Sequence, residues 1–490
     1  MKTHYIFLIF CSALICTKSL SQNLDLTNNL VTDSSSAYIE IYGMGATTDK
    51  TPFWMHANQF GTVPKKGSYG AAKIGFDKIW DISQPVRGKS NFKAGIGIEA
   101  IANVGVDKKI ILPQAYGTIQ FKNWELFVGR KKQWVGLADS TLSSGSYIWS
   151  GNSMPIPKIQ IGTRRFVSVP FTKGWLSFNG FYSDGFFENN RSFTSDLKLH
   201  QKALYLRIGN EKSRLKLFAG LNHQVQWGGK TPFETSNGQM PTGFKNYIRA
   251  VTGKRYAYEE GFTAFDYNNR VGNHLGTVDL ALAYQGYEYS VMVYRQNIYE
   301  DGSLFSFNNF KDGLNGLKIK KQNSYGANFE VKEMVFEFLY TKLQGGSIWD
   351  LATIIGRDNY FNHGQVRDGW SYYDRTIGTP FIPPTTDTYW KWPAYFFTSN
   401  NRVMVLHTGL RGTLLRNVIW QTKLSYSSNS GTYDLPFASS PTQFSGIFSL
   451  QSTINLFGGS VITCSFAGDK GELYQDSYAF SLALRKNFSF

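Results

Sequence analysis

The side chains best suited to binding a ligand lie in one long segment, residues 360–393, where aromatic rings alternate with arginines. Arg367 precedes Trp370 by three positions, and Tyr372 follows. Aromatic rings pack against the C–H faces of sugars, while arginine donates hydrogen bonds to hydroxyl and carboxylate oxygens. This combination favours contact with a polysaccharide, although an aromatic girdle at a lipid interface or packing among loops would use the same residue types. Chemistry and expected loop position together select the candidate glycan contacts: Arg130, Trp134, Trp227, His363, Arg367, Trp370, Tyr372, Trp390 and Trp392.

No motif in the chain predicts a catalytic centre. Its seven histidines include no pair at the H-E-x-x-H spacing, and neither a G-x-S-x-G turn nor a phosphate-binding glycine loop occurs. We therefore expect no enzyme activity, no metal and no cofactor. Inward-pointing glutamates could include a catalytic pair assembled from separate strands, but a charged wall balanced by Arg207, Lys216 or Arg411 is the commoner arrangement. These glutamates are Glu99, Glu125, Glu330 and Glu337.

The first residues predict export. Lys2 precedes an apolar run from Tyr5 to Ile15, which is too short to span a bilayer as a helix. Ser19 and Ser21 place small residues where a signal peptidase reads, so we expect cleavage after Ser21. Residues 1–21 are then a signal peptide, and residues 22–490 form a single domain.

Composition limits the class of protein that is exported. No other stretch has 18 consecutive apolar residues, which leaves a secreted soluble protein or a membrane β-barrel. Aromatic residues make up 16% of the chain, as expected for strands with one face in lipid and the other in a wet lumen. The 51 Lys and Arg exceed the 35 Asp and Glu; losing Lys2 and Lys18 with the signal leaves 49 − 35 = +14. This surplus favours anionic partners, and export makes nucleic acid the least suitable of them.

Three hairpins show apolar residues at every second position. They are expected around two-residue turns at Lys122-Asn123, Gln285-Gly286 and Lys332-Glu333. Residues on either side of a two-residue turn face the same side of the sheet, so the apolar face continues through each hairpin.

Connections between strands alternate between short and long, which predicts about 18 strands with both chain ends on the short-turn side. That arrangement is typical of a transmembrane antiparallel β-barrel with short periplasmic turns and long extracellular loops. The short turns are expected near 83–89, 122–123, 171–173, 210–213, 285–286, 332–333, 412–417 and 457–459. The longer segments include 131–157, 224–275, 298–321 and 344–401, and Thr47–Tyr69 is the expected first outer loop.

The last strand carries a second sign of an outer-membrane barrel. From Tyr478 onward apolar residues alternate with small or polar ones, and the chain ends with Phe488 and Phe490 on the apolar face. An apolar strand with a terminal aromatic residue resembles the signal that the barrel-assembly machinery recognises. A strand of a soluble β-sandwich would show the same alternation, but the signal peptide and the loop pattern favour the barrel.

Five blocks in order resemble the Wzi family of capsule-assembly outer-membrane proteins. They are Pro52-Phe53-Trp54-Met55-His56-Ala57-Asn58-Gln59-Phe60-Gly61, Val128-Gly129-Arg130-Lys131-Lys132-Gln133-Trp134, Ser150-Gly151-Asn152-Ser153-Met154-Pro155, Gln226-Trp227-Gly228-Gly229, and Asn362-His363-Gly364 through Asp368-Gly369-Trp370 to Ile377-Gly378. The resemblance implies an 18-stranded barrel that acts as a lectin, holding exported capsular polysaccharide at the cell surface, without enzyme activity or cofactor.

Two departures from the family pattern affect this expectation. Relatives carry a helical N-terminal plug on the periplasmic side, whereas residues 22–90 show no long amphipathic helix. If the lumen is closed, folded-in loops must close it. Relatives often have a second Trp and a Gly-Pro after the block ending at Trp134, where this chain has Val135-Gly136-Leu137.

Three functions follow, in order of preference. The first is a surface lectin for an acidic or neutral polysaccharide, embedded in outer-membrane lipid and lipopolysaccharide. The second is a diffusion porin, which needs an open lumen lined by charged residues. The third is an outer-membrane hydrolase.

Overall fold

The computed structural model describes residues 35–82, 92–106, 108–254, 259, 262–303, 308–324, 326–348, 356–389, 396–415 and 417–489. The expected signal peptide, the turn at 83–89, Trp390, Trp392 and Phe490 lie outside these residues.

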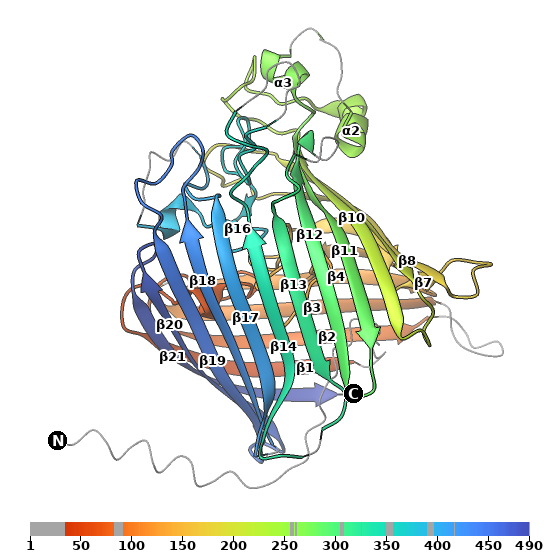
Figure 1. The fold of residues 1–490 in the computed structure, drawn as a ribbon, viewed down its shortest axis with the longest axis vertical. Coiled ribbons are helices and arrows are strands. Elements are labelled where there is room, and N and C mark those ends of the chain that lie inside the picture. Colours follow the sequence, from red (N-terminus) through yellow and green to blue (C-terminus); the bar gives the residue numbers. More distant parts are fainter. Residues whose placement is uncertain are drawn as a thin grey trace.

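The strands form one antiparallel sheet that closes on itself (Figure 1). Barrel strands follow one another in sequence order, and β1 pairs with β21 from Ser36↔Ser489 to Ala46↔Ala479, which closes the ring. Because β6 and β7 both pair with β8, they share one position, and the nineteen described strands occupy eighteen positions. The predicted all-β barrel of about eighteen strands is confirmed.

The barrel strands are β1 Ser36–Ala46, β2 Tyr69–Asp81, β3 Phe92–Gly105, β4 Lys109–Phe121, β5 Trp124–Arg130, β6 Lys158–Thr163, β7 Val167–Ser168, β8 Leu176–Phe186, β9 Lys198–Ile208, β10 Leu215–Trp227, β11 Asn273–Gln285, β12 Tyr289–Glu300, β13 Gly313–Lys321, β14 Phe329–Tyr340, β17 Val403–Leu414, β18 Val418–Asn429, β19 Thr442–Ile454, β20 Ser460–Gly471 and β21 Ser477–Ser489.

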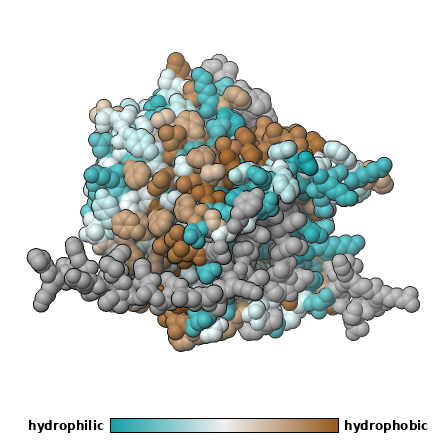
Figure 2. All heavy atoms as spheres, turned by 60° about the horizontal axis from the view of Figure 1, so that its bottom comes forward, coloured by the Kyte–Doolittle hydropathy of each residue, from teal (hydrophilic) through white to brown (hydrophobic). Residues whose placement is uncertain are grey.

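Alternating side chains give the barrel wall two different faces. On β11, Leu280 and Leu282 are exposed on the outside, whereas Asp279 and Ala281, which alternate with them, are buried. Successive strand residues point to opposite faces, so a period-two sequence produces an apolar outer wall and a polar interior. Figure 2 shows hydrophobic side chains gathered on the outer wall.

Most predicted connections lie where the sequence places them. The turns at 122–123, 171–173, 210–213 and 457–459 join consecutive strands, and the segments 131–157 and 344–401 lie in long loops. The turn expected at 412–417 starts later, because β17 ends at Leu414, and the long loop expected at 224–275 is shorter, because β10 ends at Trp227 and β11 begins at Asn273. The turn expected at 285–286 falls slightly later, because β11 ends at Gln285 and Tyr284 pairs with Val291. This shift keeps every side chain on its predicted face.

One predicted hairpin is wrong. The turn expected at Lys332-Glu333 lies inside β14, and the partner β13 occupies part of the segment 298–321 that the sequence assigns to a loop. A β-bulge between Val331 and Glu333 explains the error. The extra residue shifts the alternation by one position, as a two-residue turn also does. The strand count survives because one missed strand replaces one false strand.

The long loops gather at one rim, the upper one in Figure 1, and carry the helices found in the described part of the chain. The longest, α2, spans Gly243–Thr252, and α1 in the first outer loop is only four residues long. Within the described ranges, none of the helices has the length and apolar character that crossing a bilayer requires. Helix α1 spans Phe53–His56. The other short elements are α3 Ala264–Asn268, β15 Ser371–Tyr372, β16 Arg375–Thr376 and the 3-10 helix Thr385–Asp387.

Candidate functional site

The segment 131–157 between β5 and β6 folds into the barrel and bonds to its inner wall; we name it the plug loop. Leu137 N donates to Asp279 on β11 (2.8 Å), and Tyr147 N donates to Gln296 on β12 (2.8 Å). Lys318 on β13 binds Asp139 at 2.6 Å. The plug loop therefore spans the lumen and is held from several strands.

The strongest attachment of the plug loop is to Glu337 on β14. Its carboxylate accepts hydrogen bonds from Ser143 Oγ (2.7 Å), Ser144 N (2.6 Å) and Tyr294 OH (2.5 Å). On the other side His407 contacts Leu142 O at 2.7 Å, with the ring nitrogen facing the carbonyl. Because every partner is buried, water does not compete for these bonds.

The segment 341–402 packs on the plug loop and completes a hydrophobic core inside the barrel. Trp370 is fully buried, and its indole N–H donates to Ile148 O at 2.9 Å. Thr379 N donates to Tyr147 O at 2.8 Å. The lumen is thus filled by folded-in loops, as the sequence requires if no N-terminal helix closes it.

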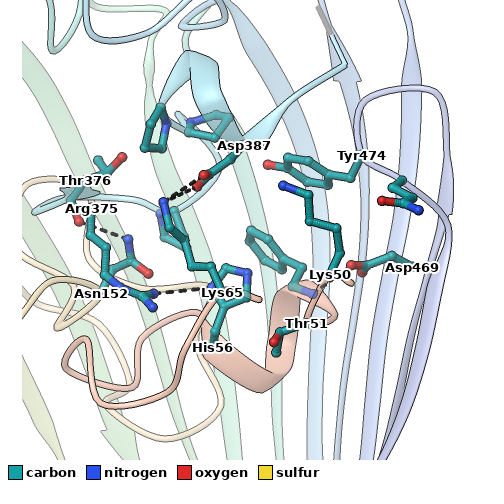
Figure 3. Close-up of a pocket in the computed structure, with 15 residues that line it drawn as sticks. Lys50, Thr51, His56, Lys65, Asn152, Arg375, Thr376, Asp387, Asp469 and Tyr474 are labelled. Carbon is teal, nitrogen blue, oxygen red and sulfur yellow. Dashed lines mark hydrogen bonds and ion pairs between the residues drawn. The ribbon is translucent and has the colours of Figure 1, made fainter. Parts of the chain in front are cut away.

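A cationic pocket opens on the long-loop side of this core (Figure 3). We define it by Lys50, His56 and Lys65 of the first outer loop, Asn152 of the plug loop, Arg375 of β16, Asp387, Asp469 and Tyr474. Its position follows from its lining, since Lys50 lies just beyond the end of β1 and Tyr474 between β20 and β21.

A tight hairpin aims Arg375 into the pocket. Tyr373 and Asp374 between β15 and β16 both have positive φ, 48° and 55°, as a two-residue turn with a right-handed twist requires. Arg375 Nη1 lies 3.5 Å from His56 Nδ1, and its Nη2 donates to Val63 O. Asn152 Nδ2 donates to Thr376 O at 2.9 Å, which joins the plug loop to this hairpin.

The charge of the pocket comes from lysine and arginine, not from histidine. Burial, and then the Arg375 and Lys65 cations, hold the pKa of His56 well below its usual 6.5. Lys65 donates to Asp387 at 2.7 Å and to Asp374 O at 3.0 Å, so Asp387 neutralises it. Lys50 and Arg375 add positive charge to the lining, and Asp469 adds a second carboxyl group.

Apolar surfaces complete the lining. The rings of Phe53 and Tyr474 stack with centroids 6.0 Å apart, and Pro380, Pro383 and Pro384 also line the pocket. The enclosed volume is about 50 Å³, enough for a few waters or one polar substituent of a sugar. The arrangement suits a sugar that lies across the opening and inserts a carboxylate or hydroxyl group.

A second hollow, the lumen cavity, lies on the opposite side of the plug loop and has a volume of about 430 Å³. Its lining includes Gln421 and Thr463, each three residues from the short-turn end of its strand, together with Glu40, Lys423 and Trp134. The plug loop therefore separates a hollow near the short turns from the pocket among the long loops.

Three of the candidate glycan contacts are partly accessible. Trp134 is 48% exposed and faces the lumen cavity, with its ring against Phe60. Arg130 donates to Tyr372 OH at 3.0 Å, and Arg367 lies 3.6 Å over the Phe233 ring. None of the three lines the cationic pocket.

Four other candidates are buried, which favours packing over glycan contact. Trp370 and Tyr372 belong to the core inside the barrel, and His363 accepts a hydrogen bond from Val366 N. Trp227 packs against Tyr247 on the outer side of the barrel. Burial lowers the pKa of His363 to about 4, so it is neutral at physiological pH.

The inward glutamates form ion pairs and hydrogen bonds instead of a paired catalytic site. Glu99 binds Lys132 at 2.6 Å, Glu125 binds Lys131 at 2.5 Å and Glu330 binds Lys321 at 2.7 Å. Two of these lysines belong to the plug loop, not to the wall positions Arg207, Lys216 and Arg411 that the sequence offered. Among the described residues, no group of three His, Cys, Asp or Glu is placed to hold a metal ion.

Sequence reasoning missed the pocket residues as ligand contacts, although signals for them existed. His56 and Asn152 belong to blocks that resemble the Wzi family, and Arg375 lies between the last two aromatic clusters of the long loop. The loops that supply them are far apart in the chain. Direct contacts between these loops, such as Lys65 with Asp387 and Asn152 with Thr376 O, bring them together.

Comparison with known proteins gives a family and a fold. A family model described as capsule assembly protein Wzi matches residues 56–409, well over half of the chain. Among solved structures, the chain is similar to Wzi of Escherichia coli, with a TM-score of 0.57 and 14% identity over 92% of this chain and 85% of that one. That protein is described as an outer membrane protein involved in group 1 capsule assembly and as a carbohydrate-binding β-barrel.

Two other solved outer-membrane structures are less similar to this chain, by TM-score and by sequence identity. A BenF-like porin from Pseudomonas fluorescens has a TM-score of 0.47 at 7% identity, covering 93% of this chain and 98% of that one. The outer membrane protein opdK of Pseudomonas aeruginosa has 0.46 at 9%, with the same coverage. No curated protein matched the chain.

Proposed function

Because the chain belongs to the Wzi family of capsule assembly proteins, we propose that it is an outer-membrane barrel that binds an exported polysaccharide at its long-loop side and holds it on the cell surface. The observation that carries this proposal is the cationic pocket, where the first outer loop, the plug loop and the segment 341–402 converge. The relative from Escherichia coli is described as binding carbohydrate, which supports the same role here.

The pocket chemistry favours an acidic sugar. Lys50 offers a charge-assisted hydrogen bond to a carboxylate, the Arg375 cation adds positive potential, and Tyr474 and the prolines offer apolar surface to a sugar ring. The net charge of the exported chain, 49 − 35 = +14, attracts the same class of polymer. A neutral polysaccharide would use the hydroxyl-binding groups alone and bind more weakly.

The filled lumen argues against a diffusion porin. A porin needs a continuous water-filled path, whereas the plug loop is bonded to β11, β12, β13 and β14 across the barrel. The proposal includes no catalytic step. Export through residues 1–21 and recognition of the last strand, whose Phe488 is exposed on the outer wall, remain parts of the proposal.

Cell-surface retention of polysaccharide tests the proposed function. A deletion strain should shed its surface polysaccharide into the medium, and the wild-type chain should restore retention. Lys50→Gln should restore it only in part, because it removes a cation that faces the pocket. Lys311→Gln is the matched control, an exposed lysine in a loop outside the pocket, and should restore retention fully. Unchanged retention in the deletion strain, with altered uptake of small solutes, would favour the porin.

A further inference from the structure

The outer wall of the barrel is incomplete on one side, where polar side chains point away from the lumen. On β9 the outward series runs Leu204, Leu206 and Ile208 toward the short turns, and these side chains are exposed. Toward the long loops the same series continues with Lys202 and His200. His200 is fully buried even though it points outward.

The neighbouring strands continue this polar patch. On β10 the exposed Leu215, Leu217 and Leu221 give way to His223, whose Nε2 lies 2.9 Å from Nδ1 of His274 on β11. On β8, Asp184 contacts His200 Nδ1 at 3.0 Å. We name this set, His200, Lys202, His223, His274 and Asp184, the polar patch. In lipid these groups need a cover, because a bilayer offers them no hydrogen bonds.

The loop 228–272 supplies that cover through α2 (Figure 1). Tyr247 OH donates to Asp184 at 2.9 Å, and Lys202 Nζ donates to Val251 O at the end of the helix. Val225 and Trp227, at the long-loop end of β10, pack with Ala250 and Val271 in a separate small core. The helix is therefore fixed against the outside of the barrel wall, across β8 to β10.

The opposite face of α2 is apolar and uncovered. Phe244 is 78% exposed and Ile248 is 43% exposed, and the spacing of four places them on one side of the helix. Lys245 and Arg249 flank them but share Glu259, so the helix contributes apolar surface more than net charge. An amphipathic helix of this kind suits a membrane interface.

The height of the apolar wall explains why such a helix is needed. On β14 every outward residue from Phe329 to Tyr340 is apolar, over ten positions of its partner β17, or about 25 Å of height for strands of 3.4 Å rise tilted by about 40°. On β10 the outward apolar residues run only from Leu215 to Leu221, six positions, or about 15 Å by the same geometry. The shortfall of about 10 Å equals the diameter of one α-helix.

We propose that α2 lies in the outer leaflet of the outer membrane, with Phe244 and Ile248 in contact with lipid acyl chains, and completes the apolar belt over the polar patch. The occupant is lipid because the helix continues an apolar surface that the barrel already presents on either side. This inference rests on the proposed function only for the membrane location of the barrel. It assigns to α2 a role in seating the barrel, separate from glycan binding.

Spin labels on single cysteines in bilayer-reconstituted protein test this assignment. The background is Cys464→Ser, and the labelled positions are Phe244→Cys and Ile248→Cys. Leu221→Cys on the wall below the helix is the lipid reference, and the exposed Thr386→Cys among the long loops is the water reference. Accessibility to oxygen reports lipid, and accessibility to a water-soluble nickel chelate reports solvent.

The expected result is that labels at 244 and 248 match the lipid reference and show several-fold less nickel accessibility than the water reference. Nickel accessibility equal to that at 386, with 221 still protected, overturns the inference and leaves the membrane barrel intact. Nickel accessibility at 221 as well overturns the barrel location itself. Protection at 244 and 248 that arises only when polysaccharide is added makes this face a glycan surface and also overturns the inference.

Discussion

Loss of the Glu337 carboxylate is the perturbation that most directly loosens the plug loop. Glu337 accepts hydrogen bonds from Ser143 Oγ and Ser144 N of the plug loop and from Tyr294 OH of the wall. In Glu337→Gln the side chain keeps its size but loses its charge, and its NH2 group must face at least one donor. The matched control is Glu330→Gln on the same strand, whose partners Lys321 and Ser324 lie outside the plug loop.

The magnitude follows from the two bonds that join the plug loop to β14, those from Ser143 and Ser144. A hydrogen bond to a charged group contributes about 1.5–3 kcal/mol and a neutral one about 0.5–1.5 kcal/mol, so each bond weakens by about 1 kcal/mol. Two bonds give about 2 kcal/mol for detachment of the plug loop from β14. Since 1.4 kcal/mol is a factor of ten, the fraction of molecules with a detached plug loop rises about 30-fold.

Single-channel recording in planar bilayers measures this fraction as open probability. The wild-type protein and Glu330→Gln should be silent apart from rare brief openings. Glu337→Gln should open about 30-fold more often, by the free energy above. Large stable openings of the wild-type protein, or equal open probability in the two variants, would refute the account of the plug loop as the element that fills the lumen.

Three further predictions concern the segment 341–402. Trp370→Ala removes a fully buried ring and a hydrogen bond to Ile148 O, which should lower the stability of this segment by about 3–5 kcal/mol. A protease should therefore cut this segment of the folded protein faster. An unchanged rate of cleavage would mean that the ring is not part of the core. Burial, and then nearby carboxylates, raise the pKa of Asp358 to about 7, above its unfolded value near 3.9. Because the folded state holds the extra proton, the free energy of unfolding should fall as pH rises from 4 to 7, by at most about 1.4 kcal/mol per pH unit. Asp358→Asn should flatten this slope in urea unfolding. Burial lowers the pKa of His363 to about 4, below its unfolded value of 6.5, so the free energy of unfolding should fall as pH drops from 6.5 to 4. His363→Gln should remove this acid sensitivity. A wild-type slope in that variant would contradict the assignment of the acid sensitivity to His363.

The barrel could be predicted from the sequence because strand alternation is a local property. Leu280 and Leu282 show their outward direction through their spacing alone, and the outcome agrees. The hairpin at Lys332-Glu333 failed for an equally local reason. A bulge and a two-residue turn shift the alternation identically, and only pairing with β17 distinguishes them.

The binding site was harder to predict because it depends on how loops fold into the lumen. Aromatic rings beside arginine suit a sugar, but they also suit a buried core, and Trp370 and Tyr372 belong to the core. No local sequence pattern predicts that Lys50 and Arg375 lie close together. Their proximity depends on contacts between loops more than two hundred residues apart in the chain, such as Lys65 with Asp387 and Asn152 with Thr376 O.

Direct binding of polysaccharide to the purified, folded barrel tests the central claim most closely. Isothermal titration calorimetry with the extracellular polysaccharide of the source cell should show saturable binding to the wild-type protein and to Lys311→Gln. Lys50→Gln should weaken the affinity about 10-fold or more, the equivalent of one charge-assisted hydrogen bond. No heat of binding to the wild-type barrel, or equal affinity in the two variants, would contradict a polysaccharide site at the cationic pocket.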